Sequence, residues 1–265
     1  MEILKGSELT KLLDDVDRLP PKRAMSIMLQ VLSALRAAHS LPDGRCLLHL
    51  DLKPQNVFVL VGEPEQIKVI DFGISQHVGA AARQAAGIGS EPTAEREEED
   101  LGKTVATVPS RADQSWFAKV NGVQRARGGT PLYASPEQCK HLRGDPDIVD
   151  LDARSDLYSL GVMAFQMLTG RLPWLCHTRE QAYRAHLETP APPMSKFGVK
   201  LPRGLEQFVA RCLQKDRDDR FANVQEAIDA LERVANPPSK WPQFVGAGAL
   251  TAGLLVWQLW PSPPP

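Results

Sequence analysis

Cysteine is scarce in this sequence, and the four cysteines that occur lie far apart. None of Cys46, Cys139, Cys176 and Cys212 belongs to a CxxC pair, and no histidine stands at the spacing of a zinc finger. The pattern therefore gives neither a disulfide framework nor a structural zinc site. We expect a reduced, cytosolic domain in which the cysteines are small core residues.

An excess of charge of one sign is also missing, as is a leader of the secretory type. The 31 Lys and Arg residues nearly balance the 32 Asp and Glu residues, for a formal net charge of -1. This balance provides no general attraction to polyanions, so no nucleic-acid partner is expected. Met1 to Lys5 is followed at once by polar residues, which indicates that no signal peptide opens the chain.

A long run without charge, FVGAGALTAGLLVW, occupies residues 244–257. Extended to 243–260, it would form a helix of about 27 Å, close to the roughly 30 Å of a bilayer's hydrocarbon core. Tryptophans stand near both ends, where these side chains favour the membrane interface. We predict a transmembrane helix at 243–260, and a buried or interfacial helix is the alternative.

The residues around this run indicate its orientation. A linker at 236–242 begins with Asn-Pro-Pro, and the tail at 261–265 carries no charge. Arg233 and Lys240 lie on the N-terminal side of the run. Because positive charge favours the cytoplasmic side, we predict a single-pass membrane protein whose main domain is cytoplasmic.

Apolar spacing predicts the remaining elements. Apolar residues recur every three or four positions after Pro21, which predicts an amphipathic helix to about Ser40. Two β-rich runs, at 57–61 and 67–70, flank a Gly-Glu-Pro turn and predict a hairpin. Further helices are predicted at 156–168, 204–214 and 223–235. The expected fold class is α+β, mainly α, with one short β-hairpin and the apolar C-terminal helix.

Residues 76–127 show little periodicity. They contain a stretch of small residues and then the acidic run EPTAEREEED at 91–100. Such a composition predicts a loop or a disordered segment.

Polar residues that could take part in a chemical reaction cluster around the predicted hairpin. The segment HLDLKPQN at 49–56 precedes the first strand and provides a carboxylate, an ammonium and an amide in Asp51, Lys53 and Asn56. The sequence IDFG closes the second strand and provides Asp71. A short hairpin would bring these groups to one end. Together, the two segments resemble the HRDLKxxN and DFG motifs of the protein kinase family.

This resemblance implies a role for each of the four residues. Asp51 would accept or orient the proton of a substrate hydroxyl, and Lys53 would steady the γ-phosphate of ATP. Asn56 and Asp71 would hold Mg²⁺ through oxygen ligands. Lysine at position 53, within DLKPxN, indicates Ser/Thr substrates. The structural alternative is that Asp51 and Asp71 cap helices or turns.

The match continues downstream of the hairpin. GTPLYASPE at 129–137 resembles the end of an activation segment, with SPE in place of the usual APE. By this resemblance, Thr130 would lie near Asp51 and Lys53 and shape the acceptor site. Asp156 would accept hydrogen bonds from the backbone of the catalytic loop, and Arg220 would form a buried ion pair with Glu137.

Three departures from the family pattern limit what the resemblance implies. Residues 1–6 resemble the hinge between kinase lobes, and the glycine-rich loop, the strand lysine and the helical glutamate of a small lobe are absent from the sequence. We therefore interpret 1–235 as a truncated kinase domain, hinge and large lobe, in which 76–127 is a long activation-segment insertion. Leu50 replaces the usual arginine, so control by phosphorylation of the activation segment is not expected.

The function expected is that of a Ser/Thr protein kinase, similar to bacterial receptor-type kinases, which transfers the γ-phosphoryl group of ATP to protein Ser or Thr. Alone, the chain would be weakly active or inactive. One alternative is a non-catalytic, membrane-anchored docking module, or pseudokinase. Another is complementation, in which a second chain or another copy supplies the small lobe.

Overall fold

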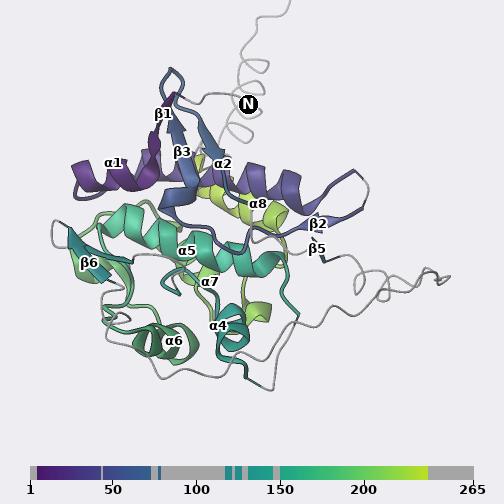
Figure 1. Ribbon diagram of the computed structural model, residues 1–265. Coiled ribbons are helices and arrows are strands. Elements are labelled where there is room, and N and C mark those ends of the chain that lie inside the picture. The colour runs from purple at the N-terminus through teal and green to yellow at the C-terminus, as the bar shows by residue number, and fades with distance from the viewer. Residues whose placement is uncertain are drawn as a thin grey trace, which may run out of the picture. The chain divides into compact units, whose positions relative to one another are not determined.

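The computed structural model describes residues 5–42, 44–72, 77–78, 117–120, 123–126, 131–145 and 150–237. The chain divides into a unit at 1–235 and a second at 236–265. The first unit is mainly helical with a small antiparallel sheet (Figure 1). The prediction of a mainly α, α+β fold is confirmed.

The predicted hairpin forms the centre of the sheet. Strand β3 (Val57–Leu60) pairs with β4 (Ile67–Val69), and Val57 lies opposite Val69. Strand β1 (Gly6–Glu8) adds to the other side of β3, which gives the order β1-β3-β4. Gly6 allows this close approach, because a Cβ there would lie 2.0 Å from the carbonyl oxygen of Val59.

The expectation of a segment without regular structure at 76–127 is wrong at three places. Strand β5 (His77–Val78) pairs with β2 (Cys46–Leu47), and β6 (Phe117–Val120) pairs with β7 (Val123–Ala126). Pairing with a partner strand offsets the weak apolar periodicity of these short runs. The second pair had a sequence signal, since Asn121-Gly122 separates its strands and this dipeptide is typical of hairpins.

Seven described helices build the rest of the unit: α1 (Leu9–Asp15), α2 (Pro21–His39), α4 (Pro136–Arg143), α5 (Ala153–Thr169), α6 (Arg179–Glu188), α7 (Leu205–Cys212) and α8 (Val224–Ala235). Short 3₁₀ turns lie at η1 (Pro54–Asn56), η3 (Met194–Phe197) and η4 (Arg217–Asp219). The four helices predicted from the sequence are confirmed as α2, α5, α7 and α8. Helix α5 begins three residues early because Asp152 caps it, accepting from the N–H of Arg154 at 2.8 Å.

Helix α5 is the core of this unit. Every residue from Ser155 to Thr169 is buried, and the helix runs between α2 and α8 on one side and α4 and α6 on the other (Figure 1). Gly161 lets α7 approach closely, because a Cβ there would lie 2.7 Å from the Cβ of Cys212. A helix buried all round gives a rigid base for the loops attached to it.

No helix among the described residues is both long and apolar enough to cross a bilayer. The span predicted at 243–260 lies outside the described residues.

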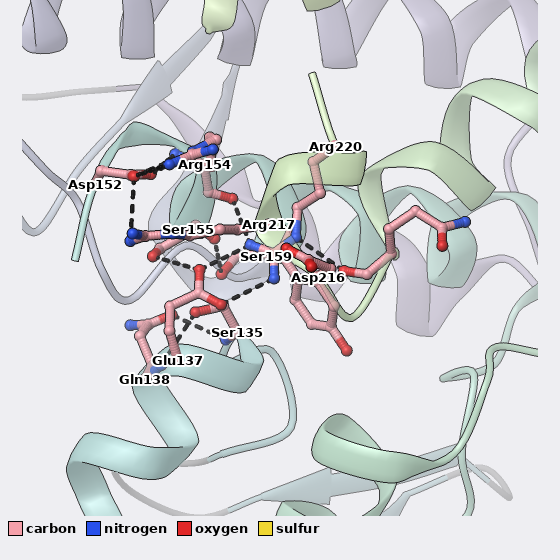
Figure 2. A network of polar contacts seen from close by, with 12 residues as sticks. Ser135, Glu137, Gln138, Asp152, Arg154, Ser155, Ser159, Asp216, Arg217 and Arg220 are labelled. Atoms are coloured by element: carbon pink, nitrogen blue, oxygen red, sulfur yellow. Dashed lines mark hydrogen bonds and ion pairs between the residues drawn. The ribbon is translucent and has the colours of Figure 1, made fainter. Parts of the chain in front are cut away.

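A buried ion pair connects α4 to the segment before α8. The guanidinium of Arg220 donates to both carboxylate oxygens of Glu137, at 2.7 and 2.8 Å, and Ser155 Oγ donates to the same carboxylate at 2.7 Å (Figure 2). Burial opposes the charge, yet the hydrogen bonds and charge of Arg220 hold the pKa of Glu137 below its usual value. Arg220 also donates to the backbone carbonyls of Arg154, Gln214 and Lys215, so the pair predicted from the sequence is confirmed and well satisfied.

We expect Glu137→Gln to lower the free energy of unfolding by about 3–5 kcal/mol, because it leaves the Arg220 guanidinium buried without a counter-charge. Asp218→Asn is the matched control, since Asp218 also pairs with an arginine, Arg154, but its side chain is 77% exposed. That change should cost about 0–1 kcal/mol. Urea unfolding of both variants measures the difference, and equal costs would contradict the assignment.

Candidate active site

A buried carboxylate anchors the loop at 49–56, which we call the catalytic loop. Asp156, in the first turn of α5, accepts from the backbone N–H of His49 at 2.9 Å and of Leu50 at 2.8 Å. His39 Nε2, from the end of α2, lies 2.8 Å from the same carboxylate. These contacts hold Leu50 at a φ of 60°, in the left-handed region that a branched residue rarely adopts. The predicted role of Asp156 as an acceptor for the loop backbone is confirmed.

Asp51, Lys53 and Asn56 meet within the catalytic loop. Lys53 Nζ lies 2.5 Å from Asp51 Oδ2. Asn56 Nδ2 donates to the backbone oxygen of Asp51 at 2.9 Å and to Oδ2 at 3.2 Å. The Asp51 and Lys53 side chains remain 23% and 20% exposed. Asp51 is thus fixed by two donors and still accessible to another molecule.

The base of the hairpin brings the segment of Asp71 to the same place. The N–H of Ile70 donates to the backbone oxygen of Asn56 at 2.9 Å, and His49 Nε2 lies 3.1 Å from the carbonyl oxygen of Ile70. The rings of His49 and Phe72 have centroids 4.6 Å apart. Asp71 lies between Ile70 and Phe72, which these contacts hold in place. It is exposed and has a φ of 64°. The structure therefore joins the two segments that the sequence singled out.

Two side chains of this site, Asn56 and Asp71, carry oxygens of the kind that could hold a magnesium ion. Because Asn56 Nδ2 faces Asp51, its Oδ1 points elsewhere and accepts no hydrogen bond from the described residues. Asp71 adds an exposed carboxylate. No group of three or more His, Cys, Asp or Glu that could hold a metal occurs among the described residues. Two protein oxygens suit Mg²⁺, which usually keeps waters or substrate phosphates as its other ligands.

Thr130 lies outside the described residues, and the buried segment that follows it packs against α5. Ser159 Oγ donates to the backbone oxygen of Tyr133 at 2.8 Å, and the Tyr133 hydroxyl donates to Gln166 at 2.6 Å. Ser135 caps α4 in a capping box with Gln138. The SPE segment is therefore fixed on the central helix near the catalytic loop.

Sequence reasoning missed a second polar cluster beneath this segment. The Tyr158 hydroxyl lies 3.0 Å from His186 Nδ1, and Lys215 Nζ donates to the carbonyl oxygens of Ala185 and His186 at 2.9 and 2.7 Å. Burial lowers the pKa of His186 to about 3, with the nearby Lys215 contributing, against a hydrogen bond to the Leu132 backbone. Burial also lowers the pKa of Lys215 to about 8. Single polar residues on separate helices give no spacing signal, so only the structure finds them.

The fold is of the protein kinase type. The protein kinase domain family matches residues 1–92 and 114–231. The chain belongs to this family.

Curated relatives agree with this assignment. The chain is 32% identical to the serine/threonine-protein kinase Pkn1 of Myxococcus xanthus over 235 residues, which are 88% of this chain and 27% of Pkn1. It is 31% identical to the serine/threonine-protein kinase PksC of Streptomyces coelicolor over 256 residues, 95% of this chain and 37% of PksC. The first relatives that it matches extend well beyond it, since the chain spans only 25% to 46% of their lengths.

A solved structure supports the fold independently. The crystal structure of the Rad53 kinase domain and SCD2 in complex with AMPPNP is similar with a TM-score of 0.54, at 18% sequence identity. The match covers 87% of this chain and 66% of that one.

His186 predicts how stability depends on pH. Its pKa is about 3 in the folded state against 6.5 for an ordinary histidine, so between these values the unfolded chain binds a proton that the folded chain does not. Stability is therefore lost as the pH falls from about 6.5 towards 3. We expect His186→Gln to reduce this slope in urea unfolding measured from pH 7 to pH 4. The matched control is His177→Gln, at an exposed position, and a slope that is the same in both variants would refute the assignment.

Proposed function

We propose that this chain is the catalytic large lobe of a Ser/Thr protein kinase, which transfers the γ-phosphoryl group of ATP to a Ser or Thr hydroxyl of a protein substrate. The observation that carries the proposal is the Asp51 carboxylate, held by Lys53 at 2.5 Å and by Asn56 at 3.2 Å while still accessible. A carboxylate held in this way can receive a hydroxyl proton and keep its orientation.

Each residue has one task in this proposal. Asp51 orients the acceptor hydroxyl and takes its proton, and Lys53 fixes that carboxylate and neutralises charge on the γ-phosphate. Asn56 and Asp71 would hold Mg²⁺, which supplies positive charge to the phosphate oxygens when bound. Thr130 would shape the acceptor site beside Asp51. Phosphoryl transfer requires mainly positioning and charge neutralisation, which these groups provide.

These 265 residues contain few of the groups that would bind a nucleotide tightly. Their sequence contains no glycine-rich phosphate loop and no strand lysine with a helical glutamate partner. Each missing charge-assisted contact corresponds to about 1.5–3 kcal/mol. We therefore propose that the chain alone binds Mg-ATP weakly, and that a small lobe, from the same polypeptide, a separate chain or another copy, completes the site.

The test compares the 265-residue chain with the same chain fused behind a protein kinase small lobe. The fusion should phosphorylate Ser/Thr peptides in the presence of Mg-ATP and show a larger thermal shift with Mg-ATP than the chain alone. Within the fusion, Asp51→Asn should lower kcat by about 10²- to 10⁴-fold because the proton acceptor is lost. Asp229→Asn, an exposed position on α8, is the matched control and should retain activity. Undiminished transfer by the Asp51→Asn fusion would remove Asp51 from this role.

The second candidate function is a non-catalytic docking module, which the absence of a nucleotide clamp in these residues favours. The same experiment separates the two functions. An intact, folded fusion that transfers no phosphate in the presence of Mg²⁺ supports the docking module and rules out the kinase proposal.

We also propose that residues 243–260 anchor the protein in a membrane, with the kinase lobe in the cytoplasm. The support is the uncharged run at 244–257 with tryptophans near its ends. The chain should then sediment with membranes and resist extraction by alkaline carbonate, whereas a chain ending at Ala235 should stay in the supernatant. Equal fractionation of the two chains would refute the anchor.

A further inference from the structure

Both ends of the Gln138 side-chain amide are used. Its Oε1 accepts from the backbone N–H of Ser135 at 2.9 Å, which is part of the cap of α4. Its Nε2 donates to the backbone carbonyl oxygen of Leu50 at 2.7 Å. The residue is 7% exposed, so water competes little with these hydrogen bonds. Gln138 thus binds the start of α4 to the residue that precedes Asp51.

The acceptor of this hydrogen bond is a strained point of the catalytic loop. Leu50 has a φ of 60°, which is costly for a residue with a Cβ and persists only where the surroundings enforce it. Asp156 fixes the N–H of Leu50 at 2.8 Å, and Gln138 fixes its C=O at 2.7 Å. The two bonds therefore determine the orientation of both peptide planes that flank Leu50.

The second of these planes includes the backbone nitrogen of Asp51, because one peptide unit contains the C=O of Leu50 and the N–H of Asp51. That N–H points to His49 Nδ1 at 3.3 Å, a long contact that by itself orients the plane weakly. A rotation of this plane would turn the Asp51 side chain away from Lys53 and Asn56. The donor from Gln138 is the short contact that opposes this rotation.

We propose that Gln138 is a positioning residue for phosphoryl transfer: its amide holds the Leu50–Asp51 peptide so that the Asp51 carboxylate faces the acceptor hydroxyl. The inference rests on the proposed kinase function. It also gives a means of coupling the SPE segment to the catalytic loop through an uncharged hydrogen bond to the backbone. The Leu50 side chain carries no charge and takes no part in this coupling.

Glutamate at position 138 separates the two halves of the amide. Gln138→Glu keeps an oxygen that can accept from Ser135 and loses the donor to Leu50. The chain offers a matched control in Gln30, whose Nε2 donates to the backbone oxygen of Glu65 at 3.2 Å and whose Oε1 accepts from the N–H of Ile67 at 3.0 Å. Gln30→Glu makes the same chemical change in an amide that bridges two backbone groups next to the turn of the hairpin, at the end away from Asp71.

The first measurement uses the 265-residue chain and needs no activity. Amide hydrogen exchange at residues 49–52 should be faster in Gln138→Glu than in the parent chain, with α5 unchanged, and Gln30→Glu should leave residues 49–52 as they are. Equal exchange at residues 49–52 in parent and Gln138→Glu would overturn the inference.

The second measurement uses the small-lobe fusion. Gln138→Glu should lower kcat by about 10- to 100-fold through misplacement of Asp51, while KM for ATP stays within about twofold of the parent value. A merely destabilising change would not produce this split at a temperature where both variants are folded. If the parent fusion transfers phosphate and Gln138→Glu is as active as Gln30→Glu, the inference fails and the kinase function stands. If the parent fusion itself transfers none, the kinase function fails, and the positioning role fails with it.

Discussion

The buried carboxylate of Asp156 is the contact on which the geometry of the site depends. It is 0% exposed and faces three donors, which come from the end of α2 and from two successive backbone N–H groups of the catalytic loop. A buried polar group is stable at such a position only where its hydrogen bonds are satisfied. Because Asp156 belongs to a helix buried on all sides, its position is set by the packing of the core. The loop therefore inherits the rigidity of α5.

A buried ion pair, between Glu137 and Arg220, fixes the other side of the site in the same way. Glu137 and Arg220 hold the start of α4 against α5 and against the segment before α8. Gln138 is the next residue in α4, and its amide reaches back to Leu50. The catalytic loop is thus fixed through Asp156 and the SPE segment through Glu137, and both anchors include a residue of α5. The hydrogen bond of 2.7 Å from Gln138 to Leu50 joins the two fixed segments directly.

Part of this arrangement could be predicted from the sequence, because the residues concerned lie close together along the chain. Asp51, Lys53 and Asn56 lie within six consecutive positions, so the motif itself brings them together, and a short hairpin is enough to add the segment of Asp71. The helices α2, α5, α7 and α8 were predicted because long apolar periodicities override local ambiguity. The strands β2 and β5 were missed because two residues carry no period. The contacts of Gln138 and His186 join residues far apart in the chain, and no spacing rule indicates such pairs.

Asp156 and Asp51 differ in burial, and the difference fits the contact that Asp156 makes with the loop and the role proposed for Asp51. Asp156 is fully buried, where low polarity strengthens its hydrogen bonds and water cannot compete for the loop backbone. Asp51 is 23% exposed, as the proposed role requires, because a group that receives a proton must reach the acceptor hydroxyl. If Asp51 were buried as deeply, no acceptor hydroxyl could reach it. If Asp156 were as exposed, water would replace its contacts with the loop, and Leu50 would relax from its left-handed conformation. The site thus depends on one carboxylate, Asp156, that is withdrawn from solvent, and on a second, Asp51, that follows the loop backbone held by the first and stays partly exposed.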